Sequence, residues 1–157
     1  MFPPAIGFIF DSELRKDPEK DELKQRSRKP VHFLPRRMYE NYLLHPKAIA
    51  AIINADNKEH QSEPLSHKIV QKWIHNARNE VCYLPKNSNQ LSESDWLYKV
   101  DGATFLENLF LKLSEGRVEF KKPNYSRKIT EWLIDNESEY LLGLSNFLVT
   151  CLNKNTK

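Results

Sequence analysis

The chain of 157 residues contains little glycine, little cysteine and no long apolar run. Its four glycines are spread along the sequence, whereas loops that bind nucleotide phosphates need several glycines within a few residues. The sequence therefore excludes a glycine-rich ATP or dinucleotide site in this chain, so any ATP must bind another segment or subunit. No apolar run approaches the ~20 residues needed to cross a bilayer. We therefore expect no membrane association.

The two cysteines, Cys82 and Cys151, lie far apart, and neither belongs to a pair with metal-ligand spacing. They provide no disulfide framework, so we expect a cytoplasmic protein. Charged residues make up 29% of the chain and apolar residues 39%, which is typical of a globular protein. The net charge of +3 is compatible with a nucleic-acid partner but does not by itself argue for one.

The first part of the sequence predicts a strand–helix–strand unit. Residues 5–10 form an almost wholly apolar run that ends at Asp11, typical of a buried strand in a parallel sheet. A charged helix follows from an Asp-Pro-Glu sequence that begins at residue 17, and 31–34 predict a second strand. Later segments place apolar residues at helical spacing. We therefore expect an α/β fold class, with a small parallel sheet followed by a mostly helical C-terminal region.

We expect one structural domain, with residues 1–46 forming the strand–helix–strand segment and residues 47–157 a helical region packed on it. Serines and an aspartate at suitable positions predict the starts of three later helices, namely Asp101, Ser126 and Ser138. Two strands do not make a stable parallel sheet alone. The chain is therefore expected either to lack an N-terminal part or to pair with the sheet of a partner.

The first candidate site is the acidic pair Asp11 and Glu13, just beyond the first predicted strand. In an extended chain, residues two positions apart project to the same side, so the two carboxylates are expected to converge. Open α/β sheets place their sites at this edge. Paired carboxylates suit Mg²⁺ or Mn²⁺, which polarises a phosphodiester and activates water. The alternative is an acidic turn that only solvates the end of the strand.

The second candidate site, Arg36, Arg37 and Glu40, follows the second predicted strand. The geometry of a strand–helix–strand unit brings this segment near Asp11. An arginine there is suited to neutralising a phosphate or a developing charge, and Glu40 is a candidate metal ligand or acidic site residue. The alternative is an ion pair between an arginine and Glu40 along one helix.

Two groups of basic residues are candidate contacts to nucleic acid. One group lies on the side of a predicted helix opposite its apolar stripe, and the other lies close to an aromatic residue that could stack on a base. These residues are Lys68, Lys72 and Arg78 in the first group and Lys121, Lys122 and Arg127 in the second. For both groups a solvated surface is the alternative.

One segment resembles a known family. Residues 34–44, L-P-R-R-M-Y-E-N-Y-L-L, resemble a block in the C-terminal TOPRIM-like domain of OLD-type (overcoming lysogenization defect) ATP-dependent endonucleases. Residues 10–13, F-D-S-E, are similar to the strand and acidic Asp-x-Asp element that precedes this block. Residues 121–123 and 130–136 are similar to the tail of those proteins. The resemblance covers most of the chain, and its Glu-Asn-Tyr-Leu-Leu block is the most specific part.

In that family the TOPRIM fold holds divalent metals and cuts DNA, and a preceding ATPase domain controls access. The resemblance therefore implies metal-ligand roles for Asp11 and Glu13 and an acidic site role for Glu40. It implies that Arg36 or Arg37 contacts the scissile phosphate. It also implies DNA as the substrate, an ATPase domain or subunit as a partner, and a role in phage defence or repair.

The chain departs from the family pattern in ways that affect its function. The first strand of a TOPRIM domain and its glutamate are absent, and Glu13 stands where aspartate is usual. We therefore expect a truncated or split protein, whose nuclease site is completed by other segments. The alternative is a non-catalytic DNA- or protein-binding module that retains a relic acidic site. A helical assembly domain without nucleic-acid contact is a third hypothesis, and a second copy of the chain is a further candidate partner.

Overall fold

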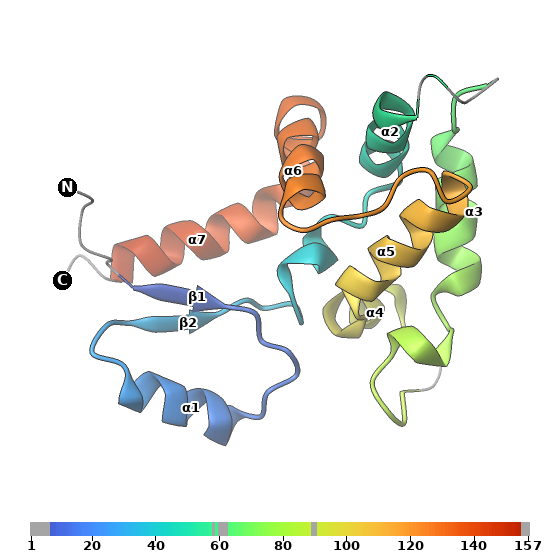
Figure 1. Cartoon of the computed structure of the whole chain (residues 1–157). Coiled ribbons are helices and arrows are strands. Elements are labelled where there is room, and N and C mark those ends of the chain that lie inside the picture. Colours follow the sequence, from blue (N-terminus) through green and yellow to red (C-terminus); the bar gives the residue numbers. More distant parts are fainter. Residues whose placement is uncertain (1–6, 58, 60–62, 89–90, 155–157) are drawn as a thin grey trace.

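The computed structural model describes residues 7–57, 59, 63–88 and 91–154. Two short strands, β1 (Phe8–Phe10) and β2 (Val31–Phe33), pair in parallel. The helix α1 (Asp17–Arg26) connects them. Figure 1 shows this sheet between α1 and the last helix, α7 (Leu142–Lys154), beside a body formed by the other helices. The predicted α/β fold class, a small parallel sheet followed by a mostly helical region, is confirmed.

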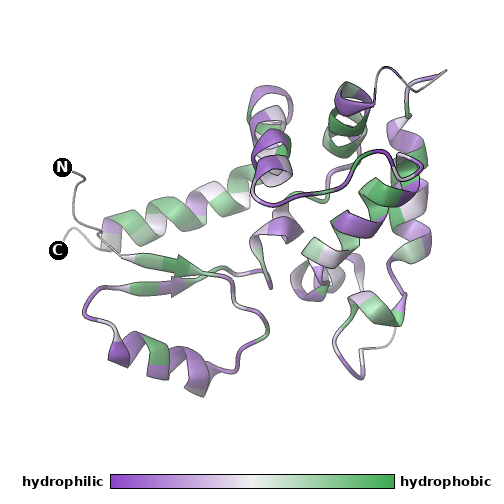
Figure 2. Ribbon diagram, viewed as in Figure 1, coloured by the Kyte–Doolittle hydropathy of each residue, from purple (hydrophilic) through white to green (hydrophobic). Residues whose placement is uncertain are grey.

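The prediction that β1 is buried is wrong. Its three side chains, Phe8, Ile9 and Phe10, are between 43% and 44% exposed. The sheet has only two strands in the described part of the chain, so no third strand covers the outer edge of β1. The helix α1 buries none of its residues, and Figure 2 shows it as hydrophilic over most of its surface. Residues 5 and 6 of the predicted strand lie outside the described residues.

The helical body contains short 3-10 helices as well as α-helices. The 3-10 helices are η1 (Tyr39–Tyr42), η2 (Val81–Tyr83) and η3 (Ser138–Leu141). The remaining α-helices are α2 (Pro46–Asp56), α3 (His67–Ala77), α4 (Glu93–Lys99), α5 (Gly102–Leu113) and α6 (Asn124–Asn136). None of the helices in these described ranges has the length and apolar character needed to span a membrane.

The core of the body is centred on α5. Phe105 of this helix is fully buried, and its ring centroid lies 5.1 Å from that of Trp73, 4.9 Å from that of Tyr83 and 5.2 Å from that of Trp96. These edge-to-face contacts join α3, η2 and α4 to α5. The aromatic cluster therefore fixes α4, a helix that the sequence analysis did not predict.

The predicted helix starts are correct for Asp101 and wrong for Ser126. The Asp101 carboxylate accepts a hydrogen bond from the Thr104 N–H at 3.1 Å, which caps the start of α5. The helix α6 begins at Asn124, so Ser126 lies within the helix, where it is buried. Ser138 begins η3, and α7 follows directly.

Candidate functional site

The segment between β2 and α2 carries the predicted site residues Arg36, Arg37 and Glu40 and is held against the junction of α4 and α5. Asn41 is fully buried, and its Nδ2 donates hydrogen bonds to the carbonyls of Leu97 (2.9 Å) and Val100 (3.0 Å). The last carbonyls of a helix lack partners within that helix, so the Asn41 side chain satisfies the end of α4. Gly102 permits this approach because a Cβ there would lie 2.9 Å from the Asn41 backbone nitrogen.

Both predicted arginines take part in contacts within the protein. The Arg36 guanidinium donates to the Asn41 carbonyl at 2.6 Å and lies over the Tyr42 ring, 4.4 Å from its centroid. The Arg37 guanidinium pairs with the Asp101 carboxylate at 3.0 Å. These contacts stabilise the turn that presents Glu40, and they are structural roles that the sequence analysis did not assign.

Glu40 is the most buried acidic side chain of the candidate site. The residue is 4% exposed, and its Oε2 lies 2.9 Å from Nζ of Lys122. Its Oε1 accepts a hydrogen bond from the Ser126 hydroxyl at 3.2 Å. A buried carboxylate needs such partners because desolvation of an unpaired charge is costly. The ion-pair partner of Glu40 in the described chain is therefore Lys122, and not an arginine of its own segment.

Asp11 lies within electrostatic reach of this ion pair. Burial raises the pKa of Asp11, and the negative charge of Glu40 raises it further, whereas the Tyr39 N–H and the Lys122 ammonium lower it. The N–H of Tyr39 donates to Asp11 Oδ1 at 2.9 Å, which fixes the carboxylate at the end of β1. Asp11, Glu40 and Lys122 therefore form one cluster, named the acidic cluster below.

Glu13 does not belong to the acidic cluster. The chain leaves the extended conformation after β1, because Glu13 and Leu14 have φ angles of 46° and 61°. The Glu13 N–H donates to the Arg37 carbonyl at 2.8 Å, and its exposed carboxylate pairs with Arg15 at 3.0 Å. The extended geometry that predicted convergence with Asp11 is therefore wrong, and Glu13 is the weakest of the charges that act on the pKa of Asp11.

Two hollows share the side chain of Tyr39. The first has a volume of about 350 Å³ and is lined by Glu40, Lys122, Ser126 and Thr130, among others. The Tyr39 hydroxyl lies 2.7 Å from Thr130 Oγ1. The second hollow, of about 410 Å³, lies between the sheet and α7 and is lined by Asp11, Tyr39 and the apolar side chains Ile9, Phe10, Leu34, Leu144 and Leu148. The acidic cluster thus has access to both hollows.

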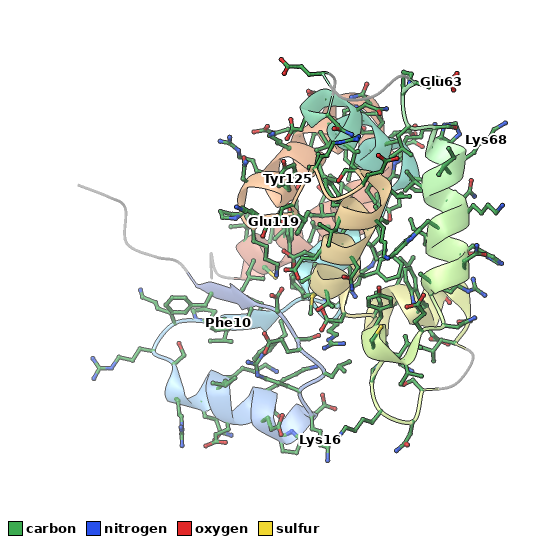
Figure 3. The ribbon with its side chains drawn as sticks, turned by 45° about the vertical axis from the view of Figure 1, so that its right-hand side comes forward. Phe10, Lys16, Glu63, Lys68, Glu119 and Tyr125 are labelled. Carbon is green, nitrogen blue, oxygen red and sulfur yellow. The ribbon has the colours of Figure 1, made fainter. Side chains whose placement is uncertain are left out.

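The basic residues predicted to contact nucleic acid do not form one surface. Lys68 and Lys72 are exposed on α3, and Figure 3 shows Lys68 at the end of that helix, on the surface. Arg78, at the other end of α3, is partly buried beside a separate cavity. Lys121 and Arg127 form ion pairs with acidic residues near them in sequence, at 3.1 Å and 3.7 Å.

The sequence analysis did not foresee how Lys122 and Ser126 meet Glu40. Ser126 lies 86 positions from Glu40 in the chain, and no local pattern in a single sequence indicates such a contact. Lys122 was predicted as a nucleic-acid contact together with Lys121. The packing of α6 against the rest of the body brings Lys122 to Glu40, and its contact with nucleic acid stays a prediction.

The acidic cluster meets part of what a divalent metal requires. In the described part of the chain, no group of three or more His, Cys, Asp and Glu side chains is arranged to hold a metal ion. Mg²⁺ is, however, often bound by one or two carboxylates, with water and substrate phosphates as its other ligands. Asp11 and Glu40 fit that smaller requirement by their chemistry, whereas the exposed carboxylate of Glu13 is paired with Arg15 and acts on Asp11 only as the weakest of the neighbouring charges.

Comparisons of this chain with protein-family models, with curated proteins and with solved structures find no match. The resemblance of residues 34–44 to OLD-type endonucleases therefore stays a prediction. What supports a function for this site is its own geometry and chemistry.

Proposed function

We propose that this chain is part of a metal-dependent nuclease, a partial TOPRIM-like domain that hydrolyses DNA phosphodiesters when other segments complete its site. The observation that carries the proposal is the acidic cluster. Asp11, after β1, lies within electrostatic reach of Glu40 in η1 and of the Lys122 ammonium, which forms an ion pair with Glu40. The cluster lies at the carboxyl end of a parallel strand, where α/β proteins place their sites.

Each residue of the acidic cluster has a distinct role in this proposal. Asp11 and Glu40 would hold Mg²⁺ or Mn²⁺, which supplies polarisation of the phosphodiester and a water of lowered pKa. Lys122 neutralises one carboxylate and carries the positive charge that suits a phosphate oxygen. The Ser126 hydroxyl orients the Glu40 carboxylate by donating to its Oε1.

The partners follow from what the cluster does not contain. Two carboxylates leave most of the coordination sphere to water, substrate and other protein groups, so another segment or subunit would supply further ligands. The resemblance to OLD-type endonucleases suggests DNA as the substrate and an ATPase domain or subunit as the partner, with a second copy of the chain as a further candidate. We place this activity in the cytoplasm, because the two cysteines, Cys82 and Cys151, lie far apart in the sequence and provide no disulfide framework.

A second function is favoured by the internal contacts of the predicted site. The guanidinium groups of Arg36 and Arg37 bind other groups of the protein, and Lys122 already neutralises Glu40. These contacts suit a non-catalytic DNA- or protein-binding module that retains a relic acidic site. Such a module would not bind a divalent metal at the acidic cluster, which separates the two proposals.

Calorimetric titration of the chain with Mn²⁺ tests the proposal. We expect saturable binding by the wild type and its loss in Glu40→Gln and Asp11→Asn, since each substitution removes one carboxylate charge without changing side-chain size. The matched control is Glu13→Gln, which is expected to bind as the wild type does. Circular dichroism and urea midpoints verify that each variant is folded. A folded wild type that binds no Mn²⁺ would favour the binding module. Loss of binding in Glu13→Gln alone would place the metal at Glu13 and contradict a metal site formed by Asp11 and Glu40.

A substitution of Lys122 gives a test in the opposite direction. Lys122→Met keeps the aliphatic part of the side chain and removes the ammonium that would compete with a metal ion for the Glu40 carboxylate. We expect Mn²⁺ to bind several-fold more tightly to this variant, because the ammonium that repels the metal ion is gone while both carboxylates keep their negative charge. Unchanged or weaker Mn²⁺ binding would contradict the placement of the metal beside Lys122.

A further inference from the structure

A separate cavity lies between the end of α3, α4 and η3. Its volume is about 310 Å³, and it shares no lining residue with the two hollows at Tyr39. Its polar lining consists of Gln71, His75, Arg78, Glu93, Trp96 and Tyr140. Leu44, Pro46, Ile74 and Leu97 supply the apolar part of its wall.

Two hydrogen-bond donors at this cavity have no acceptor in the described protein. Trp96 is 3% exposed, and its indole Nε1 is buried without a hydrogen-bond partner. Arg78 Nε is also buried without a partner. Buried donors are nearly always satisfied, because an unmade hydrogen bond is costly. The Trp96 ring packs edge-to-face on Phe105 at 5.2 Å, so its N–H is held in a fixed position.

The charges near the cavity favour an anion of low charge. Arg78 contributes one positive charge to the lining. Tyr140 is also part of the lining. Its hydroxyl lies within electrostatic reach of the positive charge of Arg36 and of the negative charge of Glu93. Two guanidinium groups thus act on this region against one carboxylate. That carboxylate disfavours a dianion such as a phosphate monoester, and the apolar wall disfavours a bare inorganic ion.

We propose that this cavity binds a small carboxylate with an apolar body. One carboxylate oxygen accepts from the Trp96 indole N–H and the other from the Arg78 guanidinium, whose planar donor group suits a carboxylate. The aliphatic body of the ligand lies against Leu44, Ile74 and Leu97. This binding site is independent of the acidic cluster and of the proposed nuclease function.

The indole N–H signal of Trp96 in a ¹H–¹⁵N NMR spectrum reports on this binding directly. The chain has three tryptophans, and the signal lost in Trp96→Phe identifies the one at the cavity. We would titrate the wild type with 4-methylpentanoate and with 3-methylbutylamine at millimolar concentration. The carboxylate is expected to give a saturable downfield shift of the Trp96 indole proton, and the amine is expected to leave it in place.

Substitutions on α3 then test the role of Arg78. We expect Arg78→Gln to weaken 4-methylpentanoate binding about tenfold or more, the loss typical of a hydrogen bond to a charged group. Arg78→Lys, which keeps the charge, is expected to bind with intermediate strength. The control Lys72→Gln removes the same charge from the exposed side of the helix and should bind normally. No shift with the carboxylate, an equal shift with the amine, or normal binding by folded Arg78→Gln would overturn the proposal.

Discussion

The buried amide of Asn41 gives the sharpest stability prediction, because it holds the segment that presents Glu40. Asn41→Ala removes two hydrogen bonds, to the carbonyls of Leu97 and Val100, at a position with no solvent exposure. Water cannot replace the lost donor without opening the junction of α4 and α5. The substitution is therefore expected to destabilise the whole domain.

The magnitude follows from those two contacts. Each net hydrogen bond contributes about 1 kcal/mol, and each carbonyl left buried without a donor costs about 1–3 kcal/mol. Because two carbonyls lose their donor, we expect Asn41→Ala to lower the free energy of unfolding by about 2–6 kcal/mol. The control Asn136→Ala removes one hydrogen bond, to the Trp132 carbonyl, at an exposed position, and it should change stability by no more than about 0.5 kcal/mol.

Urea denaturation followed by circular dichroism measures both variants. The expected result is a large fall in the urea midpoint for Asn41→Ala, with an unchanged dependence of the unfolding free energy on urea concentration. A fall in the urea midpoint no larger than that of Asn136→Ala would refute the reasoning, because the two hydrogen bonds of the Asn41 amide would then contribute little to the stability of the fold.

Two further predictions concern ionisation. Burial and the charge of Glu40 raise the pKa of Asp11 above 3.8 in the folded protein. Protonation of Asp11 therefore favours the folded state. This contribution to stability is complete below the pKa of the unfolded chain and is lost as the pH rises through the higher pKa of the folded protein. Asp11→Asn should therefore be more stable than the wild type at neutral pH, with a gain that shrinks in acid; urea midpoints across pH test this, and a less stable variant at neutral pH would contradict it. Burial and a hydrogen bond to Asp56 raise the pKa of Tyr125 to about 12. Asp56→Asn should lower that pKa toward 10, and an ultraviolet titration with an unchanged Tyr125 transition would contradict the assignment.

Local patterns in the sequence predicted the elements that depend on local chemistry. The structure contains the strand predicted before Asp11, the charged helix predicted from residue 17 and the helix cap predicted at Asp101. The burial of β1 and the cap at Ser126 were wrong, because both depend on what packs against the segment. Strand burial requires covering elements that a run of apolar residues does not specify, and Ser126 is used inside α6 as a partner of Glu40.

The candidate site could be predicted only in part for a similar reason. Asp11 and Glu40 follow the two strands, so their proximity could be expected from the strand–helix–strand geometry. The outward turn at Glu13 depends on a backbone hydrogen bond to Arg37, and its positive φ leaves no clear signal in the residue type. Lys122 comes from a distant segment, and its contact with Glu40 depends on the tertiary packing of α6.

Paramagnetic broadening of NMR signals by Mn²⁺ tests most directly whether the acidic cluster is a metal site. The predicted result is selective loss of the backbone amide signals of Asp11, Glu40 and Lys122 at low Mn²⁺ concentration, before the signals of the acidic residues Glu19 and Asp21 on α1 are affected. Uniform broadening, or broadening that begins on α1 and spares Glu40, would contradict a metal site at the acidic cluster.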